Sequence, residues 1–127
     1  MFDNTARRLD GEPPTPLAGD DQAIDFAHLF RMTLGDHSLE REVLALFDRQ
    51  AEMLIGRMAG SEPAEVAALA HTLKGSARGI GAFGVATAAE SVEAAVRARD
   101  DVEGAVEALW QAALQTRETI ANHLRAR

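Results

Sequence analysis

Apolar residues recur with helical spacing along most of this chain after residue 20. Read as a helix with a step of about 100° per residue, residues 65 to 80 gather their apolar side chains on one side of the helical wheel. This i, i+3, i+4, i+7 stripe is typical of a helix that packs on a core. The residues of the stripe are Val66, Leu69, Ala70, Leu73, Ala77 and Ile80.

Four other segments show the same kind of pattern. A short helix is expected from Ile24 to Leu34, and a long one from about Ser38 to Met58. Two more are expected at about 85–97 and 102–124. The positions expected on the buried faces are, for the four segments in chain order, Phe26, Leu29, Phe30 and Thr33 in the first; Val43, Leu46, Phe47, Gln50, Leu54 and Met58 in the second; Val85, Ala88, Ala89, Val92 and Val96 in the third; and Val102, Val106, Leu109, Ala113, Ile120 and Leu124 in the fourth.

The breaks between these segments carry turn and capping residues. Gly35-Asp36, Gly60 and residues 79–81 are expected to end helices. Ser61 and Pro63 suit the start of the helix over residues 65–80. Strict apolar alternation is absent, which argues against strands. Because short connections favour antiparallel neighbours, the predicted fold is all-α: an antiparallel up-down four-helix bundle with the short N-terminal helix capping one end.

A change in composition near residue 20 indicates a domain boundary. Residues 1–20 contain all but one of the four prolines, so no helical stripe can persist there. We interpret residues 1–20 as a flexible leader and residues 21–127 as the helical bundle domain. The 127 residues are enough for one core and too few for two ordinary ones.

Charge and residue usage exclude several classes of function. The net charge of −7 argues against nucleic-acid binding through a general basic field. With no cysteine, the chain has no disulfide and no thiolate zinc site. His28, His37 and His123 lack the spacing of a metal site. No run approaches the roughly 20 apolar residues of a membrane span, and no signal peptide is visible, so we expect a cytoplasmic protein without membrane contact.

The polar side of the helix over residues 65–80 carries the candidate chemistry. His71, Lys74, Gly75 and Arg78 lie opposite the apolar stripe and form one strip, which we expect to be exposed. Gly75 costs about 1 kcal/mol in a helix interior and leaves bare backbone that another molecule can approach. The strip itself supplies no carboxylate or second imidazole beside His71. An approachable imidazole among cations suits an anionic group such as phosphoryl.

The run His71-Thr72-Leu73-Lys74-Gly75-Ser76-Ala77, followed by Gly81, resembles the signature of histidine phosphotransfer (HPt) domains. These domains carry phosphoryl groups between aspartate-bearing receiver domains in phosphorelays. The resemblance in layout covers roughly residues 22–124. It implies that His71 is phosphorylated on the ring nitrogen furthest from the backbone. It also implies that Lys74 steadies the phosphoryl charge and that Gly75 admits the active-site loops of the receiver.

Three residues are supporting candidates. Gln50 occupies the place where some family members have a glutamine near the histidine. It also sits among core positions, where a polar residue needs a partner, so a hydrogen bond toward the His71 region is expected. Ser76 suits helix packing or contact with His71, and Arg78 suits a solvated charge or a partner contact. Gly81 and Phe83 fit the turn out of the histidine helix in the family. Docking is expected to use apolar residues near the strip, with Phe30, Met32 and Leu34 as candidates.

The expected mechanism is reversible phosphoryl transfer from a receiver aspartate to His71 and on to another receiver domain. The expected partners are receiver domains of response regulators, of a hybrid histidine kinase, or of both. By family analogy the Mg²⁺ belongs to the partner receiver, and the chain needs no cofactor of its own. No ATP-binding motif is visible, so we expect a monomeric phosphocarrier without autokinase activity, rather than a true enzyme.

Two alternatives stay open. A kinase catalytic domain could phosphorylate His71 directly, as in the histidine-bearing domain of chemotaxis kinases. Such domains usually begin a much longer chain, whereas this one ends at Arg127 soon after its last expected helix. The second alternative is a helical adaptor that binds a receiver without accepting phosphate.

Overall fold

A computed structural model describes residues 23–126, and the predicted leader over residues 1–20 lies outside this range. Within residues 23–126 the elements are helices, and no strand is present. This confirms the all-α prediction. The helices are α2 (Phe26–Met32), α3 (His37–Met58), α4 (Pro63–Ile80), α5 (Phe83–Ala98) and α6 (Val102–Arg125).

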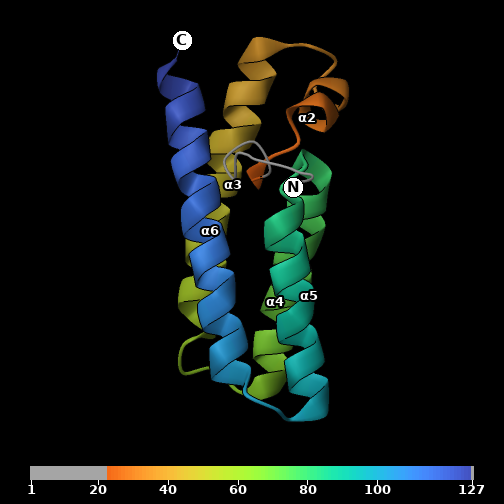
Figure 1. The fold of residues 1–127 in the computed structure, drawn as a ribbon, viewed down its shortest axis with the longest axis vertical. Coiled ribbons are helices and arrows are strands. Elements are labelled where there is room, and N and C mark those ends of the chain that lie inside the picture. The colour runs from red at the N-terminus through yellow and green to blue at the C-terminus, as the bar shows by residue number, and fades with distance from the viewer. Residues whose placement is uncertain (1–22, 127) are drawn as a thin grey trace, which may run out of the picture.

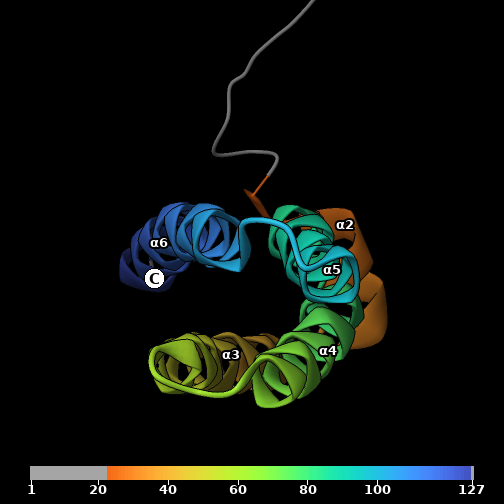
Figure 2. The same cartoon turned by 90° about the horizontal axis from the view of Figure 1, so that it is seen from below.

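The four long helices form an up-down bundle (Figure 1). Seen along their length, they follow one another around a common interior (Figure 2). Helix α4 packs between α3 and α5, and α6 packs against both α5 and α3. Helix α2 packs on α4 at the end where that helix finishes, and the Asp25 N–H donates to the Gly81 carbonyl at 2.9 Å. The predicted bundle with a short capping helix is therefore confirmed.

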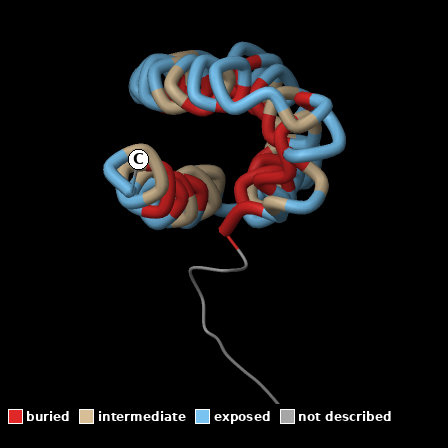
Figure 3. The backbone as a smooth tube through the Cα atoms, turned by 90° about the horizontal axis from the view of Figure 1, so that it is seen from above, coloured by how far each residue is buried: buried red, intermediate tan, exposed pale blue. Residues whose placement is uncertain are grey.

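Buried residues lie toward the inside of the ring of helices (Figure 3). Most positions predicted to be buried face this interior, but Leu46 is 60% exposed, Phe30 is exposed and Gln50 is only half-buried. Leu46 lies about 100° around the helix from Phe47, at the edge of the buried stripe. The residues of that stripe on α3, apart from Glu40, are Leu44, Phe47, Ala51, Leu54, Ile55 and Met58.

Local capping explains where two helices differ from the prediction. Helix α2 is shorter than expected because Asp25 caps its start and Leu34, with φ 55°, is left-handed. Ser61 does not cap α4. Its hydroxyl donates back to the Arg57 carbonyl at 2.5 Å, and Glu62 holds the N-cap position without a side-chain bond.

Gly81 ends α4 as expected, in a conformation that requires glycine. Its φ of 89° is left-handed, and a Cβ there would lie 2.9 Å from the Asp25 carbonyl oxygen. The same residue accepts the hydrogen bond that attaches the segment before α2. Gly81 therefore joins the end of α4 to the cap of the bundle.

Asp36 caps α3, and removing its side chain is expected to weaken the fold modestly. Its carboxylate accepts from the Leu39 N–H at 3.0 Å. We expect Asp36→Ala to lower the free energy of unfolding by about 1 kcal/mol, measured by urea denaturation. Glu62→Ala is the matched control, because Glu62 is an N-cap that makes no side-chain bond. Equal losses in the two variants would contradict this assignment.

Candidate functional site

His71 lies near the middle of α4 with its side chain 72% exposed. Its neighbours Ala70 and Leu73 are fully buried. The packing of these neighbours fixes the rotation of α4 and holds the imidazole on the outside of the bundle. The sequence predicted this exposure, and the structure agrees.

A carboxylate from the next helix contacts the imidazole. Glu93, on α5, places Oε2 at 2.9 Å from Nδ1 of His71. An ionised carboxylate can only accept, so Nδ1 donates and is the protonated nitrogen of the neutral ring. This leaves Nε2, the nitrogen furthest from the backbone, with an available lone pair.

Glu93 also binds Lys74. The Lys74 Nζ lies 2.6 Å from Glu93 Oε1, and the two side chains are only 14% and 13% exposed. The pKa of Glu93 is lowered from its ordinary value of 4.5, mainly by the hydrogen bond from Lys74 and further by His71, against the opposing effect of burial. Glu93 is therefore an anion at neutral pH, hydrogen-bonded to His71 and ion-paired with Lys74.

These contacts correct two expectations. Lys74 does not stand exposed on the strip, because Glu93 draws its ammonium toward α5. No residue of α4 on the strip supplies a carboxylate beside His71, as expected. Helix packing nevertheless brings the carboxylate of Glu93, 22 residues further along the chain, to the ring. The available sequence signal was weak: Glu93 directly follows the buried Val92, at the edge of the apolar stripe of α5.

The rest of the strip is open. Gly75 is exposed, and a Cβ built on it would meet nothing within 4 Å. Arg78 pairs with Glu90 of α5 at 3.5 Å, and both side chains are more than half exposed. Exposed pairs of this kind contribute little to stability. The side of the strip toward α5 thus carries two sets of ion pairs.

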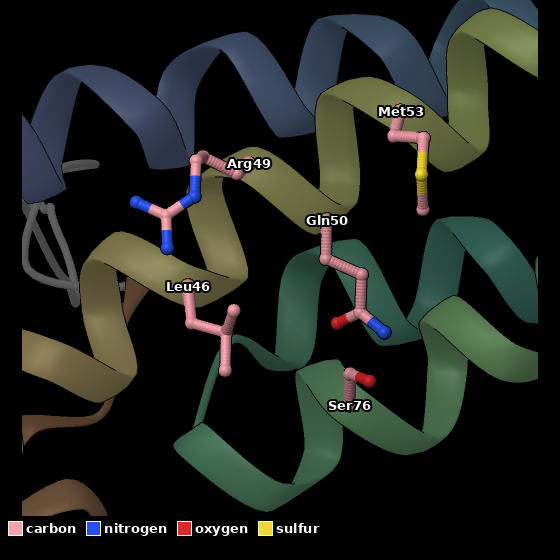
Figure 4. A pocket seen from close by; sticks show the side chains of 5 residues that line it. All are labelled: Leu46, Arg49, Gln50, Met53 and Ser76. Carbon is pink, nitrogen blue, oxygen red and sulfur yellow. The ribbon is translucent and has the colours of Figure 1, made fainter.

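The side toward α3 is a groove. Figure 4 shows the side chain of Gln50 reaching from α3 toward Ser76 on α4, with Leu46, Arg49 and Met53 along the same wall. Within residues 23–126 no hydrogen bond joins Gln50 or Ser76 to His71, so the hydrogen bond expected from Gln50 toward the His71 region does not reach the ring. Both residues line the groove instead.

The remaining histidines lie at the surface or at helix boundaries. His28 Nε2 lies 3.0 Å from the Gly79 carbonyl oxygen. His123 Nε2 lies 2.9 Å from Glu40 Oε1, and its ring stacks on Phe26. His37 is exposed. In the part of the chain that the structure describes, no three potential metal ligands come together.

The predicted docking residues Phe30, Met32 and Leu34 are all exposed on α2 and the turn after it. Their role in docking stays a prediction. None of the helices described here is long and apolar enough to cross a membrane.

Comparison with known proteins places these features in a family. Residues 38–125 match the Hpt domain, and this range covers well over half of the chain. A search of curated proteins gave no match, and a search of solved structures also gave none.

Proposed function

The chain belongs to the Hpt domain family, and we propose that it accepts a phosphoryl group on His71 from an aspartate of one receiver domain and passes it to another. Membership of the family makes it a histidine phosphotransfer domain of a phosphorelay. The observation that supports His71 as the acceptor is its exposed ring, held at Nδ1 by Glu93.

The transfer step follows from the protonation of the ring. The Nε2 lone pair attacks the phosphorus of the aspartyl phosphate, an N–P bond forms, and the P–O bond to the aspartate breaks with its electron pair leaving on the carboxylate. Nδ1 keeps its proton, so the ring gains positive charge as the new bond forms. Glu93, 2.9 Å away, stabilises that charge. The reverse step regenerates the neutral ring.

Magnesium is assigned to the receiver in this proposal. Glu93 is the carboxylate that contacts His71, and its two oxygens are directed to His71 and Lys74. They are therefore poorly placed to ligate a metal. The carrier supplies a positioned nucleophile and a docking surface, which suffice because phosphoryl transfer depends mainly on alignment and electrostatics.

In this scheme, the ion pair of Lys74 with Glu93 positions the carboxylate that holds the His71 ring. Its ammonium carries three N–H donors, so one can hold Glu93 while another meets the phosphoryl group on Nε2. The expectation that Lys74 steadies the phosphoryl charge becomes a proposal that Lys74 does so while keeping its ion pair with Glu93.

A labelling experiment tests the proposed function. Receiver domains from the same source, phosphorylated with ³²P, are mixed with the wild-type chain, with His71→Gln and with His37→Gln. His37 is also exposed and lies in the first turn of α3, so it is the matched control. We expect acid-labile label on the wild type and on His37→Gln, and none on His71→Gln.

Other outcomes identify the alternatives. Binding of a receiver by wild type and His71→Gln alike, with label on neither, would indicate an adaptor. Label that comes only from a kinase catalytic domain with ATP, and from no receiver, would indicate a domain phosphorylated directly by a kinase.

A further inference from the structure

The two sides of the His71 strip differ in charge. Toward α5, the carboxylates of Glu93 and Glu90 are paired with cations of α4. Toward α3, the groove presents the guanidinium of Arg49, whose residue is exposed. Within residues 23–126, the Arg49 side chain makes no ion pair and no hydrogen bond. Within the described residues, an unpaired cation therefore lies on the α3 side of the strip, on a chain whose net charge is −7.

In this range Arg49 has no carboxylate within ion-pair distance. Glu42 lines a neighbouring hollow with Arg49 without pairing with it, and the pairing of α3 with α6 takes up a second nearby carboxylate. Glu52, three residues further along α3, is well spaced to pair with it. Arg117 of α6 takes that carboxylate instead, at 3.5 Å, and holds Asp48 at 2.6 Å. The hydrogen bond to Asp48 raises the pKa of Arg117, and this guanidinium contacts both Asp48 and Glu52.

The surroundings of Arg49 suit a protein surface. Leu46 and Met53, one turn before and after it on α3, are 60% and 53% exposed. Gln50 and Ser76 add uncharged polar groups to the groove (Figure 4). Ser76 follows His71 by five residues, which is about 7.5 Å along the helix axis. Ser76 also lies about 140° around α4 from His71, so a globular partner reaches this groove when it is centred on His71 and extends toward α3.

We infer that Arg49 determines which receiver is served, by pairing with an aspartate or glutamate on the docking face of that receiver, beside an aliphatic side chain that contacts Leu46 and Met53. This inference rests on the proposed function and adds to it the chemistry of the partner surface. A charge at the edge of an interface acts mainly on encounter and on partner choice. Receivers with a lysine or arginine at that position would be rejected by like charge.

The experiment measures initial rates of transfer from ³²P-labelled receiver domains of the same source to the full chain. Arg49→Glu is compared with Arg97→Glu, which makes the same charge change on an exposed residue of α5. For the receiver that the wild type serves fastest, we expect Arg49→Glu to raise KM by about tenfold or more. The rate at saturating receiver should change by less than about threefold, and Arg97→Glu should resemble the wild type.

Charge reversal on the receiver completes the test. Each aspartate and glutamate on its docking face, outside its active site, is changed to lysine in turn. One of these variants should regain transfer with Arg49→Glu while losing it with the wild type. Equal effects of Arg49→Glu and Arg97→Glu, or no restoring variant, would overturn the inference.

The two proposals fail in different ways. Absence of label on the wild type, or label that persists in His71→Gln, would count against the proposed function. Normal labelling of His71 together with unchanged kinetics in Arg49→Glu would remove the role of Arg49 alone.

Discussion

Gly75→Glu is expected to slow phosphoryl transfer to His71 by about 100-fold or more without unfolding the domain. Gly75 lies one turn beyond His71 on the exposed strip, and a Cβ built there meets no other part of the fold within 4 Å. The glutamate would therefore occupy the space that the receiver must enter, and its charge would repel the acidic site of the receiver.

The fold should tolerate this change and even gain from it. Replacing glycine in a helix interior favours the helix by up to about 1 kcal/mol, so Tm should stay level or rise. Transfer rates are measured with a labelled receiver, and helicity and Tm by circular dichroism. Gly75→Ala should fall between the wild type and Gly75→Glu.

Gly84→Glu is the matched control for the added side chain. Gly84 is also exposed with nothing within 4 Å of a built Cβ, but it lies in the first turn of α5. We expect it to transfer normally. Normal transfer by Gly75→Glu would contradict the docking of a receiver over this strip.

Glu93→Gln is expected to slow transfer by about 10- to 100-fold, in line with the effect of removing a carboxylate that orients a functional histidine. Glutamine lacks the charge that stabilises the imidazolium character of the phosphorylated ring. Its amide N–H can also donate to Nδ1, which favours the unreactive tautomer with the proton on Nε2. The ¹⁵N chemical shifts of the His71 ring report the tautomer directly.

Glu90→Gln is the control for Glu93→Gln. It removes a carboxylate from the same helix, but one that pairs with Arg78 at the surface. Its transfer rate and the His71 tautomer should match the wild type. A normal rate and an unchanged tautomer in Glu93→Gln would show that the contact at 2.9 Å has no part in the reaction.

Because the pKa of Glu93 is lowered in the folded state, Glu93→Gln should also change how the free energy of unfolding depends on pH. A carboxyl group whose pKa is lower in the folded state stabilises the fold above its unfolded pKa, near 4.5, and loses this effect as the pH falls through the folded pKa. Wild type should therefore exceed Glu93→Gln in free energy of unfolding at pH 7. The difference should shrink below pH 4.5 in urea titrations, and a difference independent of pH would contradict the linkage.

Helical periodicity was sufficient to predict the fold and the exposure of His71. The stripe from Val66 to Ile80 fixes which side of α4 is buried, and a repeat of 3.6 residues is a local property that any window of the chain displays. His71 and Gly75 must then face outward. Gly81 could likewise be assigned to the end of α4, because left-handed backbone there favours glycine over any other residue.

Residues at the edge of a stripe were predicted less well. Leu46 and Gln50 lie where a small rotation of α3 decides between burial and exposure, and the neighbouring helix sets that rotation. The groove beside Ser76 arises from this geometry. Periodicity alone ranks both residues as core positions, because it contains no information on where the next helix packs.

Local sequence pattern was thus enough to place the helices, their buried faces and the outward histidine with its bare glycine. Which charges meet depends instead on how the helices pack. Glu93 reaches His71 across 22 residues, and Arg117 reaches Asp48 across 69. Such pairs depend on the order, height and rotation of packed helices, which no local repeat encodes. Packing therefore holds Lys74 and the His71 ring through Glu93, and it leaves Arg49 facing the groove.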